Sequence, residues 1–285
     1  MEYPLITPMS RRQTHLLFPQ WQGAGAVPAL QSGALALAEQ FGGREEWLVV
    51  PVAAAMPLTM EAGILGRADL VRQLRQAHAL LQGARPDVLT VVGGDCSVEI
   101  APVSYLNRRY AGDLALVWLD AHADLNTPAS SPSGTLHGMP LRVLLGDGDS
   151  DILGQAFSKL DPRQVVLAGV RAFDPPERAY VEAQGLMHLT ADAFARDPDE
   201  LIGAIRARGY RHIYVHLDFD VLDPTTFTST EWPTPGGLTP DALGRVLVAL
   251  QGAFDVVGLG ATEYFPQRDE DLQTAYTLLL TAAPR

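Results

Sequence analysis

Two carboxylates and an imidazole alternate in the stretch WLDAHADLN. Asp120, His122 and Asp124 follow directly after the apolar run ALVWL. In an extended chain alternate side chains point to one face, so these groups would project together from the end of a buried strand. Asp218 and Asp220, in HLDFDVLDP, have the same spacing. Converging carboxylates repel each other and tend to protonate unless a cation holds them.

Four aspartates, Asp120, Asp124, Asp218 and Asp220, carry four negative charges, which two divalent ions would balance. Oxygen ligands together with an imidazole suit Mn²⁺ better than a soft metal, although Zn²⁺, Fe²⁺ and Ni²⁺ are also compatible. Two such ions polarise a bridging water and deliver hydroxide at neutral pH. The spacing therefore predicts a two-metal cage, with DAHAD as one half and DFD as the other.

Short apolar runs that alternate with helical patterns would position these groups. Strands are expected at 45–52, 87–94, 114–121, 164–170, 212–219 and 256–263. These runs are too uniformly apolar for half-exposed strands and indicate strands covered on both faces. Helices are expected at 29–41, 66–83, 97–110, 175–185, 192–208, 239–252 and 269–282. The alternation predicts an α/β fold with right-handed crossovers, a mainly parallel sheet and one domain over residues 1–285.

Acidic residues stand at or just after the carboxyl ends of five expected strands. They are Asp95, Asp120, Asp124, Asp174, Asp218, Asp220 and Glu263. Ligands of open α/β sheets bind at this edge. Helix N-capping would explain Asp95 or Asp174 alone, but it does not explain a pair such as Asp218 and Asp220.

Composition narrows the class of protein. The chain has 285 residues, of which 47% are apolar and 19% charged, as in a globular protein with a sizeable core. The net charge of -12 argues against nucleic acid or an anionic membrane as a partner. The single cysteine, Cys96, excludes an internal disulfide. With no signal-peptide pattern and no membrane-spanning apolar stretch, a cytoplasmic location is expected.

Six motifs resemble the ureohydrolase family, whose members include arginase and agmatinase. The matching stretches, in family order, are GGDCS, DAHADLN, SGTLHGMP, LDFDVLDP, PGGLT and ATEYFP. The resemblance implies an arginase-like, three-layer α/β/α fold. It also implies hydrolysis of a small guanidino compound to an amine and urea at a binuclear manganese site, in a homo-oligomer such as a trimer or hexamer.

The resemblance also implies roles for individual residues. The family's metal ligands are matched by Asp120, His122, Asp124, Asp218 and Asp220. His137 matches its proton-shuttling histidine, and Glu263 matches the carboxylate that receives the guanidinium. The implied catalytic set is His137, Asp124 and Glu263.

Substrate specificity is implied by the loop DLNTPASSPSGTLHG, which is closer to the arginase version than to the agmatinase version. Asn126 and Ser133 match positions that receive an α-carboxylate, and Asp174 matches an acid that meets an α-ammonium. Thr135 replaces an asparagine, and Trp232 replaces a threonine. Ordinary turn chemistry also explains Asn126 and Ser133. Trp232 either borders the pocket, where it could stack on a planar cation, or points into the core.

Cys96 is the main departure, because the family pattern has a ligand histidine after GGD. A thiolate ligand would favour Zn²⁺ or Fe²⁺ over Mn²⁺. A protonated thiol would leave one metal position weak or empty, and a third interpretation is a packing residue. A family branch that hydrolyses N-hydroxyarginine also has cysteine here.

His216, two residues before Asp218, is either a substitute ligand or a histidine bonded to a neighbour.

The sequence thus predicts a metal-dependent amidinohydrolase. Its substrate would be arginine or N-hydroxyarginine, and its products ornithine with urea or hydroxyurea. The alternatives are an agmatinase or guanidino-acid hydrolase, a single-metal or altered-metal hydrolase of the same fold, and a catalytically weak relative with one metal site impaired.

Overall fold

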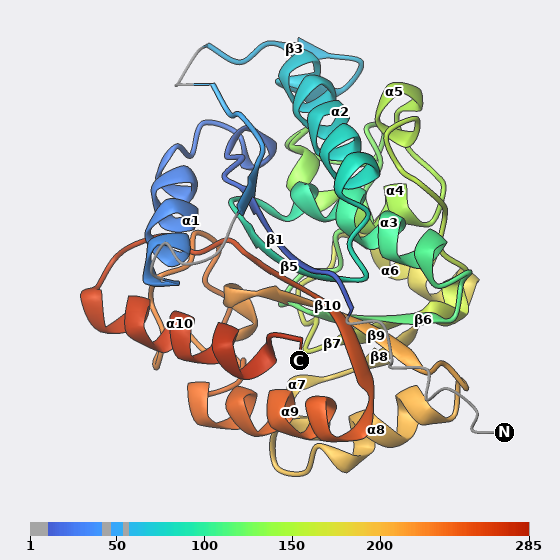
Figure 1. Ribbon diagram of the computed structural model, residues 1–285, viewed down its shortest axis with the longest axis vertical. Coiled ribbons are helices and arrows are strands. Elements are labelled where there is room, and N and C mark those ends of the chain that lie inside the picture. Colours follow the sequence, from blue (N-terminus) through green and yellow to red (C-terminus); the bar gives the residue numbers. More distant parts are fainter. Residues whose placement is uncertain (1–10, 42–46, 54–56, 285) are drawn as a thin grey trace, which may run out of the picture.

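A parallel sheet forms the centre of the computed structural model, which describes residues 11–41, 47–53 and 57–284 (Figure 1). Within these residues eight strands form one sheet, in the order β2-β1-β5-β10-β9-β6-β7-β8. All neighbouring pairs run parallel. The strands are β1 (Gln13–Phe18), β2 (Trp47–Val49), β5 (Val88–Gly93), β6 (Leu114–Leu119), β7 (Val165–Ala168), β8 (Met187–Leu189), β9 (His212–Asp218) and β10 (Asp255–Thr262). A separate antiparallel hairpin pairs β3 (Met60–Glu61) with β4 (Ile64–Leu65).

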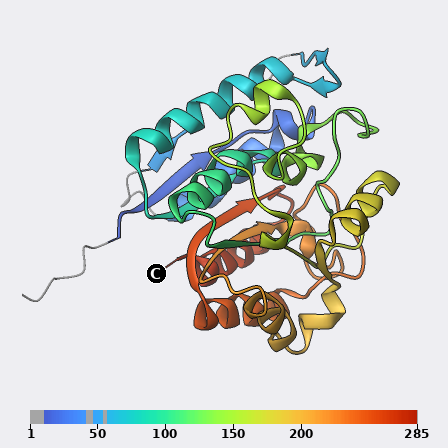
Figure 2. The same cartoon turned by 90° about the vertical axis from the view of Figure 1, so that its right-hand side faces the viewer.

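Helices cover both faces of the sheet, and Figure 2 shows the two layers on opposite sides of it. One face packs against α2 (Arg67–Ala84), α3 (Ile100–Arg109), α4 (Pro140–Leu144), α5 (Ser150–Leu153) and α6 (Pro175–Gln184). The other packs against α1 (Ala29–Gln40), α7 (Ala191–Ala195), α8 (Asp199–Arg206), α9 (Pro240–Ala253) and α10 (Asp269–Ala282). The predicted three-layer α/β/α fold with a parallel sheet is confirmed.

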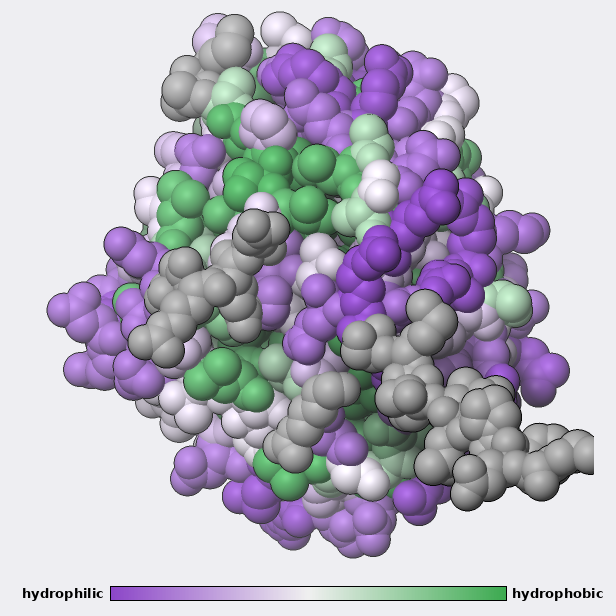
Figure 3. All heavy atoms as spheres, viewed as in Figure 1, coloured by the Kyte–Doolittle hydropathy of each residue, from purple (hydrophilic) through white to green (hydrophobic). Residues whose placement is uncertain are grey.

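The pattern of each element explains its place in these layers. Every residue of β5 and β6 is buried, as expected for strands covered on both faces. Along α2, Leu70, Leu74, Ala77 and Leu81 are buried at the spacing of one helical face. Figure 3 shows hydrophilic residues gathered over the region of α2 and α3 on the outer surface. In the described part of the chain no helix combines the length and apolar character needed to cross a membrane.

The strand order places four strands with functional candidates side by side. β5, β10, β9 and β6 are neighbours in the middle of the sheet, although β5 and β6 are consecutive long strands in the chain. In the sheet, β5 and β6 are therefore separated by β10 and β9, which come later in the sequence. Such a change in strand order opens a crevice at the carboxyl ends, where α/β proteins bind ligands.

All six predicted strands occur in the sheet, but some boundaries and elements differ from the prediction. Residues 45 and 46 of the first predicted strand lie outside the described residues. The predicted helix 192–208 is two helices, because Pro198 stands at the N-cap of α8 and begins a new helix. The predicted helix 97–110 begins as a 3₁₀ turn, Cys96–Glu99, before α3. The prediction missed two strands of the sheet. They are β1, whose apolar run is short and follows two arginines, and β8, which has only three residues.

Candidate metal centre

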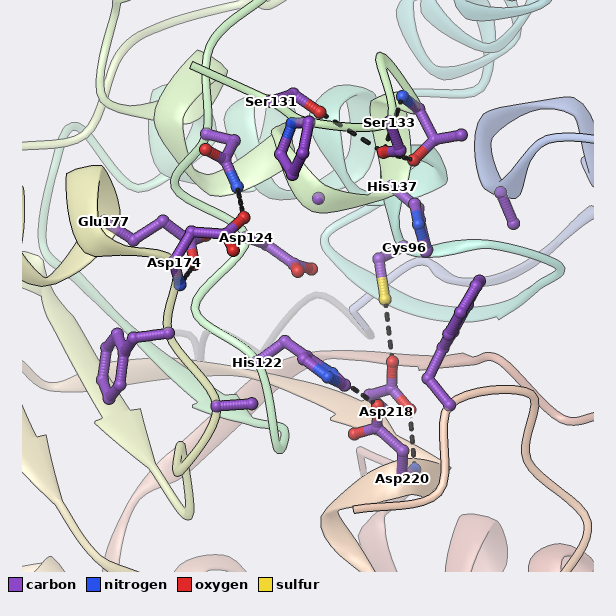
Figure 4. Close-up of a pocket in the computed structure, with 18 residues that line it drawn as sticks. Cys96, His122, Asp124, Ser131, Ser133, His137, Asp174, Glu177, Asp218 and Asp220 are labelled. Atoms are coloured by element: carbon purple, nitrogen blue, oxygen red, sulfur yellow. Dashed lines mark hydrogen bonds and ion pairs between the residues drawn. The ribbon is translucent and has the colours of Figure 1, made fainter.

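The candidate site lies where four adjacent strands end. β5 ends shortly before Cys96, β6 ends before Asp120, β9 ends at Asp218, and β10 ends before Glu263. Because these strands are parallel neighbours, their carboxyl ends meet at one edge of the sheet. Figure 4 shows Cys96 and Asp218 facing each other at this edge.

The same local turn follows β6 and β9. Asp120 Oδ1 accepts a hydrogen bond from the backbone N–H of His122 at 2.6 Å, and Asp218 Oδ1 accepts one from Asp220 at 2.7 Å. Asp220 Oδ1 in turn accepts from the backbone N–H of Ala121 at 2.9 Å, which ties the two strand ends together. Backbone donors thus help to position these carboxylates.

The electrostatic environment of His122 is strongly negative. Its Nδ1 lies 2.7 Å from Asp220 Oδ2 and 3.7 Å from Asp120 Oδ1. Burial by itself lowers the pKa of His122, but the charges of Asp220 and Asp120 outweigh burial and raise this pKa to about 12. A position that favours positive charge so strongly is suited to a bound cation.

Two carboxylates of the site are not neutralised by protein groups. Burial, together with the charge of Asp120, raises the pKa of Asp124 well above its usual range. Burial and the charge of Asp220 do the same to the pKa of Asp218. Among the described residues Asp124 Oδ2 is buried without a hydrogen-bond partner. A divalent cation would remove the repulsion and satisfy this oxygen, so the residues present fit a metal.

Cys96 lies among these carboxylates and also lines the cavity described below. Its Sγ donates to Asp218 Oδ2 at 3.1 Å and lies 3.3 Å from Thr262 Oγ1. Burial, and then the charge of Asp218, raises the pKa of the thiol well above its usual value. The raised pKa favours the protonated thiol, and metal binding would favour the thiolate.

The possible ligand atoms form three overlapping groups in the described part of the chain, each within 4.8 Å. They are Cys96, Asp120, Asp124 and His216; Cys96, Asp218 and Glu263; and Asp120, His122 and Asp220. The structure thus brings together all six predicted ligands, with His216, which the sequence offered as a substitute ligand, and Glu263, the predicted guanidinium carboxylate. This mixture of oxygen, nitrogen and sulfur donors suits a divalent transition metal.

Two residues of the site have left-handed backbone conformations that non-glycine residues seldom adopt. Asp124 has a φ of 53° and Glu263 a φ of 60°. The backbone N–H of Glu263 donates to the carbonyl of Gly94 at 2.7 Å, which helps to hold this conformation. Such strain persists where the surroundings demand one side-chain direction, as at ligand sites.

A cavity of about 470 Å³ opens onto the cage. Its lining includes the predicted substrate and proton-transfer residues Asn126, Ser133, Thr135, His137, Asp174 and Trp232. It also includes the cage residues Cys96, His122, Asp124, Asp218 and Asp220, whereas Asp120 and Glu263 lie outside the lining.

Polar side chains at the outer part of the cavity bond to one another. Asn126 Nδ2 donates to Asp174 Oδ2 at 2.8 Å. Ser133 Oγ and Thr135 Oγ1 lie 2.6 Å apart. Asn126 and Asp174 form one polar cluster, and Ser133 and Thr135 form another. The cavity thus presents two polar clusters to a ligand.

His137 and Glu263 form a pair beside the cage. His137 Nδ1 lies 3.4 Å from Glu263 Oε1, which also accepts the backbone N–H of Cys96 at 3.1 Å. Burial alone would lower the pKa of His137, but its interaction with Glu263 produces a net rise. Glu263 Oε2 is buried and has no hydrogen-bond partner within the described residues.

Trp232 borders the cavity rather than entering the core. Its side chain is 44% exposed, and its ring centroid lies 5.8 Å from that of His137. Arg171 holds the loop that carries Trp232, because its guanidinium donates to the carbonyls of Thr234 and Pro235 and to that of Asp220. The loop is thereby fixed to the end of β9.

Sequence reasoning missed Arg171 and several residues of the cavity wall, among them Ser131, Phe173 and Glu177. Glu177 had a detectable signal, because Asp174 and Glu177 form a capping box at the start of α6. Its Oε1 also accepts the backbone N–H of Leu125 at 2.9 Å, which links α6 to the cage loop. Arg171 had no sequence signal, since its partners are backbone carbonyls from other loops.

Comparison with known proteins gives consistent results. The Arginase family pattern matches residues 31–282. An arginase from Staphylococcus aureus is 34% identical over 194 residues, which cover 65% of this chain and 63% of that protein. The match therefore spans less than two thirds of this curated relative. An Entamoeba histolytica arginase solved with L-ornithine superposes with a TM-score of 0.85 at 21% identity, covering 95% and 98% of the two chains. Bacillus caldovelox arginase gives 0.81 at 23% identity, covering 95% and 97%.

Replacing Asp218 by alanine is expected to abolish stable metal binding. The change removes one carboxylate that faces Cys96 and frees the Asp220 backbone N–H. We expect the affinity for divalent metal to fall more than about 100-fold. Replacing a residue that only hydrogen-bonds to a ligand typically costs about 10–100-fold. Metal per chain after gel filtration is the measurement. Asp255→Asn, at the opposite end of the sheet, is the matched control, and full metal content in Asp218→Ala would refute the proposed cage.

Proposed function

This chain belongs to the arginase family, and we propose that it is a metal-dependent amidinohydrolase acting on an arginine-like amino acid. The products would be ornithine and urea, or hydroxyurea from N-hydroxyarginine. The observation that carries the proposal is the His137–Glu263 pair, 3.4 Å apart, beside a carboxylate cage. His137 at the cavity wall would supply a proton donor, and Glu263 just outside the lining a guanidinium acceptor, next to the proposed metal site.

The cage residues would hold two divalent ions. The proposed ligands are Asp120, His122, Asp124, Asp218 and Asp220, with Cys96 at the position of the family's histidine. When bound, the ions supply Lewis-acid activation of water at neutral pH. Mn²⁺ is the proposed metal, while the sulfur of Cys96 makes Zn²⁺, Fe²⁺ or Ni²⁺ the alternatives at its position.

The chain's own residues would orient the substrate and move the proton. The free Oε2 of Glu263 offers a planar guanidinium a charge-assisted hydrogen bond. Nδ1 of His137 faces Glu263, which leaves Nε2 to donate a proton to the departing amine nitrogen. Asp124, as a cage carboxylate, would position the attacking water.

The two polar clusters at the outer cavity support an α-amino-acid head group. Asp174 would receive the α-ammonium, while Asn126, Ser133 and Thr135 would donate to the α-carboxylate. The structural relative from Entamoeba histolytica was solved with L-ornithine, which has such a head group. Trp232 would border the substrate entrance.

Cys96 favours N-hydroxyarginine as a second candidate substrate. Its thiol lies 3.1 Å from Asp218, at the position where the family branch that acts on N-hydroxyarginine also has cysteine. A hydroxyguanidine is less basic than a guanidine, and its oxygen offers an additional metal ligand. The other candidates are a guanidino-acid hydrolase and a catalytically weak relative. A homo-oligomer in the cytoplasm would fit any of these activities.

Arginine and N-hydroxyarginine are expected to be better substrates than agmatine, which lacks the carboxylate. Agmatine would leave the donors for the α-carboxylate unpaired. Its kcat/KM should therefore be lower than that of arginine by a factor on the order of 10²–10⁴. Ser133→Ala should reduce kcat/KM for arginine about tenfold and leave agmatine turnover nearly unchanged, since only arginine loses a hydrogen bond. Steady-state kinetics on the three compounds test this. A higher kcat/KM for agmatine would disprove the head-group assignment.

Cys96→His is expected to increase manganese binding and arginine turnover. Imidazole binds Mn²⁺ better than a thiol that must first lose its proton within a negative cage. Manganese per chain and urea release at saturating metal are the measurements. Cys96→Ser serves as control, because it removes the thiol without adding a nitrogen ligand. If Cys96→His changes neither quantity, Cys96 is a packing residue.

A further inference from the structure

Behind the cage lies a buried polar group that the proposed reaction does not use. Glu99, His216 and Tyr214 are all fully buried. Within the described residues, both carboxylate oxygens of Glu99, the Tyr214 hydroxyl and His216 Nδ1 have no hydrogen-bond partner. Burying several polar groups that lack short hydrogen bonds is costly, so their presence together calls for a function.

We infer that His216 is a metal ligand through Nε2, completing the metal position formed by Cys96, Asp120 and Asp124, with Glu99 as the carboxylate behind the imidazole. His216 would supply a nitrogen donor at the position where Cys96 replaces the expected histidine. The inference rests on the proposed metal centre, but it is independent of the substrate and of the reaction.

The strand register directs His216 toward the cage. His216 and Asp218 alternate along β9, so both side chains lie on the same face of the sheet. Trp118, directly opposite on β6, stacks on the imidazole at 3.5 Å with 18° between the rings. The indole Nε1 also donates to Asp120 Oδ2 at 3.0 Å. Trp118 therefore fixes the plane of the His216 imidazole and the position of Asp120 Oδ2.

The distances suit atoms that share an ion. His216 Nε2 lies 3.6 Å from Asp120 Oδ2 and 3.6 Å from Cys96 Sγ. Metal bonds of about 2.1 Å to nitrogen or oxygen and about 2.3 Å to sulfur allow two ligand atoms to be at most about 4.4 Å apart. The ligand atoms of Cys96, Asp120, Asp124 and His216 all lie within 4.8 Å of one another, close to this limit.

Glu99 occupies the place of a supporting carboxylate. Its Oε1 lies 3.8 Å from His216 Nδ1, at ion-pair distance. Gly260 on β10 is the register partner of His216, and a Cβ there would lie 1.6 Å from Glu99 Oε1. The absence of a side chain at Gly260 thus makes room for the carboxylate. Metal-bound histidines usually donate their second N–H to such a group, which sets the orientation of the ring.

Other histidines of the protein differ from His216 in their hydrogen bonds. A ring nitrogen of His78, His188 or His212 lies 2.7–2.9 Å from a protein oxygen. His216 is more deeply buried than these, and within the described residues its Nε2 lies 3.6 Å from both Cys96 Sγ and Asp120 Oδ2. Nε2 thus faces atoms of two proposed ligands, while Nδ1 has no hydrogen-bond partner within the described residues.

Cobalt binding tests this inference directly. Each metal-bound imidazole keeps one exchangeable N–H, whose proton resonance is strongly shifted by bound Co²⁺. Protein labelled with ¹⁵N-histidine should show two such resonances, from His122 and His216. The His216→Gln protein should lack the His216 resonance. It should also bind about one Co²⁺ fewer per chain. His188→Gln, on β8 of the same sheet, is the matched control and should retain both resonances.

Glu99→Gln provides a second measurement that retains the imidazole. It should keep both shifted resonances but lower Co²⁺ affinity by about 10–100-fold, because the second carboxylate is lost. If the His216→Gln spectrum retains every shifted resonance of the wild-type spectrum, the inference is overturned and the proposed function remains intact. Failure of the wild-type protein to bind Co²⁺ would overturn both.

Discussion

The repulsion among buried carboxylates at one edge of the sheet is the constraint on which this structure depends. Asp120, Asp124, Asp218 and Asp220 lie within a small, largely buried region, where His122 neutralises only part of their charge. Burial and mutual repulsion raise the pKa values of Asp124, Asp218 and Asp220. A divalent cation resolves this conflict, because it replaces repulsion with attraction and satisfies oxygens that lack protein donors.

Backbone contacts within the fold also hold this arrangement. The strand order places β5, β10, β9 and β6 side by side, so that segments distant in the chain end at the same point. Backbone N–H groups hold Asp120, Asp218 and Asp220, and left-handed backbone at Asp124 and Glu263 directs their side chains. A site organised in this way requires little rearrangement when the metal binds.

The motifs and the fold class were accessible from sequence because they depend on local spacing. Alternating acids after apolar runs predicted the cage, and the alternation of strands and helices predicted the parallel sheet. The environment of His216 was not accessible in this way. Glu99 begins a helix and would be expected to face solvent, but the space beside Gly260 on a distant strand buries it. Arg171 likewise depends on carbonyls contributed by other loops.

Thermal unfolding as a function of free divalent metal tests the central claim most directly. A ligand that binds only the folded state stabilises it in proportion to the logarithm of its concentration above Kd. The midpoint of unfolding should therefore fall when metal is removed by a chelator and rise steadily as Mn²⁺ is added back. A midpoint that stays constant from chelator to saturating Mn²⁺, and with each alternative metal, would contradict the account, because the carboxylates would then be stable without a cation.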